Sequence, residues 1–335
     1  MNLNLVAPFL LSLLPVLVLL GALIVLDSYA LVPLHVVVAM LGVGAAMAIA
    51  SYFANARLMQ LFGMRLQDYS GFAAPLVEEA LKAIVIVWLI RRHRIGFLVD
   101  AAIMGFALGC GFALLENIYA VWRIPTAGMS TWIIRGFGTA IMHGGATAAF
   151  ALVSLAILER DERHGFFALL PGFIAAVVLH STFNLLIHEP VLTTCIMLVA
   201  VPLLLMLAWH RGEQSLGDWL GRGFDADAEL LEIINSGQFA ASPVGRYLLG
   251  LKTRFSGPTV VDLLCYLRLF TELSLRAKGI LLMRENGFEA GVDEATQASF
   301  VELSHLEKTI GVTGLMALHP LLPMRRKALR QLYLL

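Results

Sequence analysis

The chain has 335 residues, of which 59% are hydrophobic and only 14% are charged, and its mean hydropathy is +0.81. Soluble domains usually carry about 25% charged residues, so this composition excludes an ordinary soluble protein and indicates an integral membrane protein. The formal net charge is zero, which gives no electrostatic reason to expect a nucleic-acid partner.

Seven apolar segments lie in residues 1–209, each about 20 residues long, which is the length that a bilayer core requires of a helix. In chain order they are 3–25, 33–54, 70–90, 98–122, 132–157, 165–187 and 190–209. The predicted fold class is therefore all-α, with a polytopic membrane helix bundle of about seven spans followed by a small helical soluble domain.

The soluble domain is predicted from the distribution of charge. Residues 1–209 contain ten Lys or Arg and ten Asp or Glu, whereas the shorter segment 210–335 contains fourteen of each. Its apolar and charged residues recur at helical spacing, which predicts amphipathic helices. No motif in 210–335 suggests catalysis, and two roles stay open for it: binding a cytoplasmic partner or gating access to the membrane domain.

The orientation in the membrane is predicted from loop arginines, because Lys and Arg are enriched in cytoplasmic loops. Six of them fall on the side of the C-terminal region and four on the other side. We therefore expect the N-terminus outside and the C-terminal domain in the cytoplasm. The six are Arg91, Arg92, Arg94, Arg160, Arg163 and Arg211, and the four are Arg57, Arg65, Arg123 and Arg135.

Four of the predicted spans carry ionisable side chains where a lipid-facing helix would have none. Such groups cost several kcal/mol at membrane depth unless they are paired or protonated, so each is a functional hypothesis. The third span contains Glu78, Glu79 and Lys82, the fourth Glu116 and Asn117, the fifth His143, and the sixth His180 and Asn184.

Helical geometry places these groups at similar depths. With a rise of about 1.5 Å per residue, Glu78 lies about 12 Å and His143 about 16 Å from the starts of their spans. Glu116 and His180 lie about 9 and 10 Å from the ends of theirs. Starts of odd spans and ends of even spans are on the same side of the membrane. All four sets are therefore predicted to meet in one leaflet, which is the extracytoplasmic leaflet by the loop arginines.

The two adjacent glutamates of the third span differ in their helical position. Glu78 and Lys82 are four residues apart and share a face, which predicts that they form an ion pair. Glu79 lies about 100° around the helix, so we expect it to be the freer carboxylate. The pattern favours Glu79 as the general base without deciding between the two.

The motifs EExxK, FxxxEN, HxxxA and HxxxN on four successive spans resemble the PrsW family of intramembrane proteases. That family is related to the CAAX-processing and bacteriocin-immunity (Abi/CPBP) membrane proteases. In the CAAX proteases the second motif ends in His, where this chain has Glu116, so the PrsW branch is favoured. The resemblance covers residues 70–187, the expected catalytic core. The matching residues are Glu78, Glu79, Lys82, Phe112, Glu116, Asn117, His143, Ala146, His180 and Asn184.

The resemblance implies a glutamate-dependent endopeptidase in a bacterial plasma membrane that cleaves a membrane-anchored protein, such as an anti-sigma factor, on its extracytoplasmic side. No cofactor is expected from the residues themselves. In the hypothesis that follows, Glu78 or Glu79 activates a water molecule that attacks the scissile carbonyl. His143, His180 and Asn184 would stabilise the oxyanion. Glu116 would orient a histidine or protonate the leaving amine, and Lys82 and Asn117 would have supporting roles.

Other interpretations of the same residues stay open. Two His and up to three Glu from separate helices could bind zinc, although no HExxH motif points to it. Buried Glu and His chains also occur in proton-coupled transporters and sensors. A membrane scaffold without activity could keep the same residues for structure alone. In that case Glu78 and Lys82 would be a structural pair, and Asn117 a hydrogen bond between helices.

Overall fold

The computed structural model describes residues 3–65, 68–160, 167–185, 189–286 and 294–322 and the single positions 288, 329 and 333. Every regular element in these residues is a helix, which confirms the predicted all-α fold. By its internal contacts the chain divides into two compact units, Met1–Gly212 and Glu213–Leu335.

The predicted spans correspond to successive helices of the first unit. They are α1 (Leu3–Leu26), α2 (Leu34–Phe62), η1 (Tyr69–Ala73) with α4 (Ala74–Arg91), α5 (Leu98–Arg123), α6 (Met129–Ile134) with η2 (Arg135–Thr139) and α7 (Ala140–Arg160), α8 (Leu170–Leu185) and α9 (Pro190–Asn235). Within the described residues, six helices are long and apolar enough to cross a membrane. The predicted third span is not among the six, because α4 carries four charged residues. The ends of the predicted sixth span, 165–187, lie outside the described residues.

Two helices run further than the apolar segments that predicted them. The second span was expected to end at residue 54, but α2 continues to Phe62. The seventh was expected to end at residue 209, but α9 continues to Asn235. Hydropathy falls at both places, yet a helix ends only where its backbone is interrupted. The interruption after α2 is Gly63, whose φ of 61° forms a left-handed C-cap.

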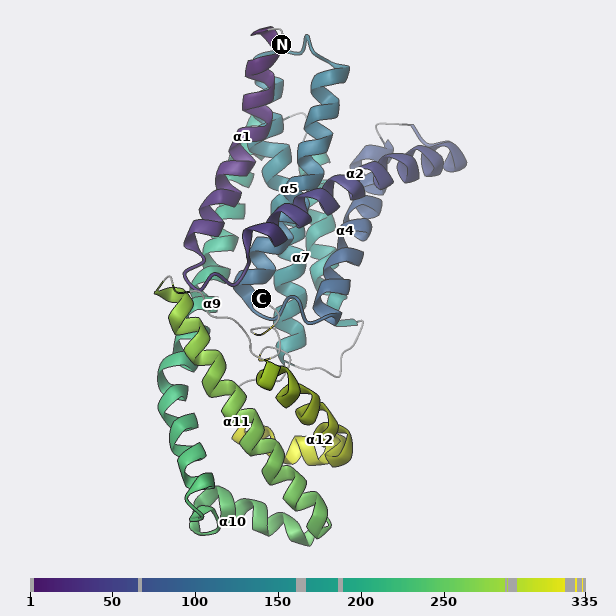
Figure 1. The fold of residues 1–335 in the computed structure, drawn as a ribbon. Coiled ribbons are helices and arrows are strands. Elements are labelled where there is room, and N and C mark those ends of the chain that lie inside the picture. Colours follow the sequence, from purple (N-terminus) through teal and green to yellow (C-terminus); the bar gives the residue numbers. More distant parts are fainter. Residues whose placement is uncertain are drawn as a thin grey trace. The chain divides into compact units, whose positions relative to one another are not determined.

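The core of the first unit is α5, with α2 and α7 packed closely against it (Figure 1). Glycines allow this approach. A Cβ atom at Gly109 would collide with the carbonyl group of His143, and one at Gly111 would collide with the backbone of Leu41. Small residues let helix backbones approach in membrane proteins, where packing rather than exclusion from water holds helices together. This packing brings α5 and α7, which carry Glu116 and His143, into direct contact.

The described elements of the second unit are also helices. It contains the end of α9, η4 (Phe239–Ala241), α10 (Pro243–Gly250), η5 (Leu251–Thr253), α11 (Gly257–Glu285), α12 (Glu294–Leu318) and η6 (His319–Leu321). Lys278 of α11 is fully buried and pairs with Asp227, with 2.7 Å between Nζ and Oδ2. Ser274 donates to the same carboxylate oxygen. A buried, hydrogen-bonded pair of this kind is accounted for by structure alone.

The close packing of α2 on α5 can be tested with two glycines of α2. In Gly44→Ala the new methyl group would meet the carbonyl oxygen of Leu108 and lie 2.8 Å from the backbone nitrogen of Phe112. We expect a loss of about 1–3 kcal/mol from overpacking, measured as a lower Tm in detergent. Gly42→Ala is the matched control, because nothing lies within 4 Å of its new Cβ. Equal Tm values for the two variants would contradict the described packing.

Candidate active site

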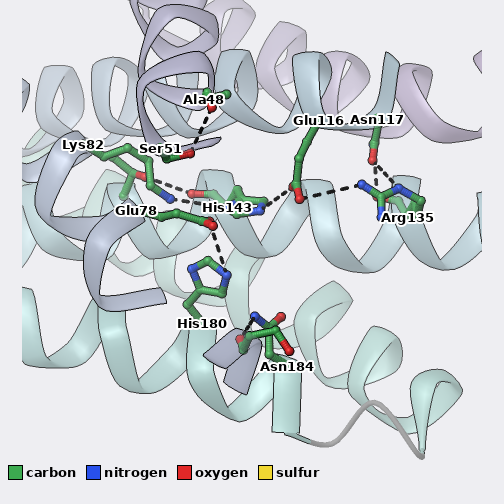
Figure 2. A network of polar contacts seen from close by, with 12 residues as sticks. Ala48, Ser51, Glu78, Lys82, Glu116, Asn117, Arg135, His143, His180 and Asn184 are labelled. Atoms are coloured by element: carbon green, nitrogen blue, oxygen red, sulfur yellow. Dashed lines mark hydrogen bonds and ion pairs between the residues drawn. The ribbon is translucent and has the colours of Figure 1, made fainter. Parts of the chain in front are cut away.

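The ionisable side chains predicted to share one depth meet in the interior of the first unit (Figure 2). They come from four helices: Glu78, Glu79 and Lys82 from α4, Glu116 from α5, His143 from α7 and His180 from α8. Glu79, Lys82, His143 and His180 are each no more than 2% exposed. The sequence-based expectation that these groups gather at one site therefore agrees with where the structure places them.

The centre of the cluster is the Glu79 carboxylate. Its Oε1 lies 2.5 Å from the Lys82 ammonium and 2.8 Å from Nδ1 of His180. A carboxylate only accepts hydrogen bonds, so His180 carries its proton on Nδ1 and donates it to Glu79. The predicted pair between Glu78 and Lys82 is therefore wrong. Spacings of three and four residues both bring side chains together on a helix, and Lys82 turns to Glu79, which shares the buried face.

His143 is held by partners on both ring nitrogens. Its Nδ1 lies 3.2 Å from the Lys82 Nζ, and its Nε2 lies 3.0 Å from Oε2 of Glu116. An ammonium group only donates hydrogen bonds, so Nδ1 must accept and Nε2 must carry the proton that Glu116 receives. The Lys82 ammonium also lies 4.7 Å from the centre of the Phe112 ring, a cation–π contact. Lys82 thus connects the Glu79 carboxylate to the second histidine.

Glu78 is the less constrained of the two adjacent glutamates. Its Oε1 accepts a hydrogen bond of 3.1 Å from the Asn55 amide of α2, and its Oε2 lies 3.9 Å from Nε2 of His180. The expectation that Glu79 is the freer carboxylate is wrong, because the Lys82 pairing on which it depended goes to Glu79 instead. Which of the two glutamates acts in chemistry stays a prediction, and the geometry now favours Glu78.

Asn117 connects three elements. Its amide nitrogen donates to the carbonyl of Ser12 in α1 over 2.7 Å, and its amide oxygen accepts from Nε of Arg135 in η2 over 2.8 Å. Arg135 also reaches Glu116, with 3.9 Å between Nη2 and Oε1. Asn117 is thus a hydrogen-bonding link between helices, as the structural interpretation of the sequence expected. Glu116 is the most exposed carboxylate of the site, with 40% of its side chain accessible.

The hydrogen bond that the structure shows for Asn184 goes to the backbone and not to the cluster of ionisable side chains. Its amide nitrogen donates to the backbone carbonyl of Ser70 over 2.9 Å. Ser70 belongs to η1, the π-helical turn that precedes α4. Asn184 therefore attaches α8 to the start of the helix that carries both glutamates. Its role as an oxyanion donor stays a prediction, which would have to use the second N–H of the amide.

Three polar residues of the surroundings were not singled out from the sequence. Asn55 and Tyr69 fall between the predicted second and third spans, and Arg135 is one of the arginines on which the predicted orientation rests. Tyr69 donates to the Asn55 amide oxygen over 3.0 Å. One signal could have identified Arg135, since an arginine inside the predicted span 132–157 needs a partner at that depth.

The donor set of the site suits a zinc-type divalent ion. Glu78, His143 and His180 each present a ligand atom, and these atoms lie within 4.8 Å of one another. Two imidazoles and one carboxylate are a common ligand set of catalytic zinc. In the neutral form of His180 the proton lies on Nδ1, so a lone pair at Nε2 faces Oε2 of Glu78 over 3.9 Å. A cation or a water molecule satisfies such an arrangement.

Charge and hydrogen bonding add two conditions to metal binding. The three carboxylates of Glu78, Glu79 and Glu116 face two cations, Lys82 and Arg135, so the site can accept further positive charge. His143 has no free lone pair while Lys82 donates to its Nδ1. Metal binding through that nitrogen therefore requires the ammonium to move away. The three residues therefore fit a metal ion, provided that Lys82 moves away from Nδ1 of His143.

A comparison with protein families finds one match. The model of a family described as PrsW family intramembrane metalloprotease matches residues 32–207, which is more than half of the chain. The matched region contains the whole cluster. No curated protein and no solved structure matches the chain significantly. Together with the six apolar helices, the match makes this an integral membrane protein.

The buried pair at the centre of the site can be tested by removing one charge and then both. Lys82→Met leaves the buried Glu79 carboxylate without its cation, and we expect a loss of about 3–5 kcal/mol in stability. Unfolding by SDS in mixed micelles measures it. The double variant Lys82→Met with Glu79→Gln removes both charges and should recover much of that loss. A double variant that is no more stable than Lys82→Met would contradict the pairing.

Proposed function

Because the chain belongs to the PrsW family of intramembrane metalloproteases, we propose that it hydrolyses a peptide bond of a membrane-anchored protein at the cluster around Glu78. The observation that carries the proposal is the meeting of Glu78, His143 and His180 from three helices, with ligand atoms within 4.8 Å of one another. Carboxylate and imidazole groups at this distance can activate a water molecule, either directly or through a shared metal ion.

In the proposed mechanism, Glu78 and His180 would hold a zinc-type ion, together with His143 once Lys82 has moved away from its Nδ1. Such an ion, when bound, supplies an activated water molecule and polarises the scissile carbonyl. Glu79 keeps His180 oriented by accepting its Nδ1 proton, so that Nε2 points towards Glu78. Lys82 neutralises Glu79 and keeps that carboxylate from competing for the same cation. The buried position of these groups strengthens each electrostatic interaction.

Glu116 is the proposed group for proton transfer to the leaving amine. Its carboxylate accepts the Nε2 proton of His143 and is the part of the site most open to its surroundings. An accessible carboxylate beside a histidine can take up a proton and release it to a substrate group within reach. Arg135 lies on the far oxygen of this carboxylate and limits its rotation.

A mechanism without metal is the second candidate, and one observation favours it. Both ring nitrogens of His143 already have partners, Lys82 and Glu116, so this histidine is a ligand only after rearrangement. In that mechanism the Glu78 carboxylate takes one proton of the attacking water, and the Nε2 lone pair of His180 accepts a hydrogen bond from the same water and orients it. The two mechanisms require the same residues and differ in metal content.

The proposed substrate is a protein with a single membrane span, because the site lies among membrane-spanning helices. We propose that cleavage occurs in the extracytoplasmic leaflet of a bacterial plasma membrane, with the N-terminus outside and the unit Glu213–Leu335 in the cytoplasm. The support is the bias of loop arginines. An anti-sigma factor is the substrate type that the family resemblance suggests. The C-terminal unit is proposed to bind a cytoplasmic partner.

Proteolysis is tested by comparing the N-termini of membrane proteins in cells that express the wild type or Glu78→Gln. We expect at least one new N-terminus near a membrane span that needs Glu78, and a loss of about 100-fold or more in its formation. His180→Ala should behave in the same way. Glu272→Gln is the control, because Glu272 lies in the second unit and pairs with the exposed Arg276. Unchanged cleavage by Glu78→Gln would contradict the proposed role of Glu78.

Metal dependence is tested on purified protein by elemental analysis and by cleavage before and after chelation. We expect roughly one zinc per chain, lost in Glu78→Gln and in His180→Ala. Glu116→Gln should keep its zinc, because Glu116 is not among the converging ligand atoms. Full cleavage by protein shown to contain no metal would exclude the zinc mechanism and leave the metal-free one.

A further inference from the structure

Glu78 is held from outside the four motifs, by two residues of neighbouring elements. The Asn55 amide nitrogen of α2 donates to its Oε1 over 3.1 Å. The Tyr69 hydroxyl of η1 donates to the Asn55 amide oxygen over 3.0 Å. Among the described residues, Asn55 is the one side chain within hydrogen-bonding distance of the Glu78 carboxylate. Glu79, by contrast, has two side chains within hydrogen-bonding distance, Lys82 and His180.

The direction of these two hydrogen bonds follows from chemistry. A carboxylate only accepts, so Asn55 must turn its NH₂ group towards Glu78. Its carbonyl oxygen then faces Tyr69, whose hydroxyl must donate. The tyrosine and the carboxylate therefore favour the same orientation of the amide, and the amide in turn holds one oxygen of the carboxylate. If the Tyr69 hydroxyl is lost, the Asn55 amide keeps only one of the two side-chain hydrogen bonds that fix its orientation.

Tyr69 is itself held in place by the backbone around it. It is buried and is the first residue of η1, a single π-helical turn that leads directly into α4. The next residue, Ser70, accepts the amide of Asn184 from α8. A Cβ atom at Gly71 would lie 3.0 Å from the side chain of Leu185, also in α8. The π-helical turn is thus attached both to α2 and to the helix that carries His180. Such turns occur frequently at functional sites.

We propose that Asn55 and Tyr69 are positioning residues that set the Glu78 carboxylate against His180. With Oε1 held by Asn55, Oε2 remains free and lies 3.9 Å from the His180 Nε2 lone pair. The inference rests on the proposed function, in which Glu78 and His180 act together. It applies equally to the metal-bound and the metal-free mechanism, because both need this carboxylate oxygen to face this nitrogen.

A positioning role and a purely structural role for Asn55 predict different effects on kcat, KM and Tm. Positioning acts on the chemical step, so substitutions should lower kcat and leave KM and Tm near their wild-type values. Tyr69 acts through Asn55, so its effect should disappear once Asn55 is gone. Independent structural contributions would instead add.

The experiment measures cleavage of a fluorescent peptide in bicelles. The peptide contains the membrane span and cleaved segment of the substrate found by the N-terminus comparison. We expect kcat to fall about 10- to 100-fold in Asn55→Leu and less in Tyr69→Phe, which keeps the ring and removes only the hydroxyl. The double variant should be no slower than Asn55→Leu. Tyr52→Phe is the control, since Tyr52 lies one turn earlier on α2 with an exposed side chain.

Each outcome decides between the alternatives. Wild-type kcat in Asn55→Leu, or additive losses in the double variant, would overturn the positioning role while leaving the protease intact. A fall in Tm that matches the fall in activity would assign Asn55 to structure and would also overturn it. Failure of the wild type to cleave any membrane protein would instead refute the proposed function, and the inference with it.

Discussion

The site depends on the burial of a full ion pair, Lys82 with Glu79, inside a bundle of apolar helices. Neither group reaches water, so each must be satisfied by protein. The lysine therefore contacts Glu79, His143 and the face of Phe112, and the glutamate contacts Lys82 and His180. Satisfying one charge pair orients both histidines. The contacts that compensate for burying the two charges are therefore the same contacts that fix the geometry of the site.

Backbone packing brings these partners within reach. Gly109 of α5 lies against the backbone of His143, and α2 approaches α5 through Gly44 and Gly111. The two helices that carry Glu78 and His143 each begin after a π-helical turn, η1 and η2. Each turn contributes a side chain to the surroundings of the site, Tyr69 from η1 and Arg135 from η2. The π-helical turns at the starts of α4 and α7 thus help to position the carboxylates of Glu78 and Glu116.

The two adjacent glutamates have different surroundings and, in consequence, different proposed roles. Glu79 is enclosed and bound to a cation and an imidazole, which makes it a fixed charge that orients its neighbours. Glu78 is held at one oxygen by an amide and has its other oxygen free beside His180. A free carboxylate oxygen is what either a metal ion or an attacking water requires. For a chain of this protease family, we therefore assign the proposed chemistry to Oε2 of Glu78 and an orienting role to Glu79.

The sequence by itself determined the all-α membrane fold and the Glu, Lys and His residues that meet, because bilayer thickness and the cost of buried charge leave strong signals in composition and spacing. It could not decide how those residues pair. Spacings of three and four residues are equally compatible with contact on a helix. Lys82 pairs with Glu79 because both lie on the face of α4 that is buried against His143 and His180. The helix ends, and the roles of Asn55, Tyr69 and Asn184, were likewise decided only by tertiary packing, since their partners are distant in the chain.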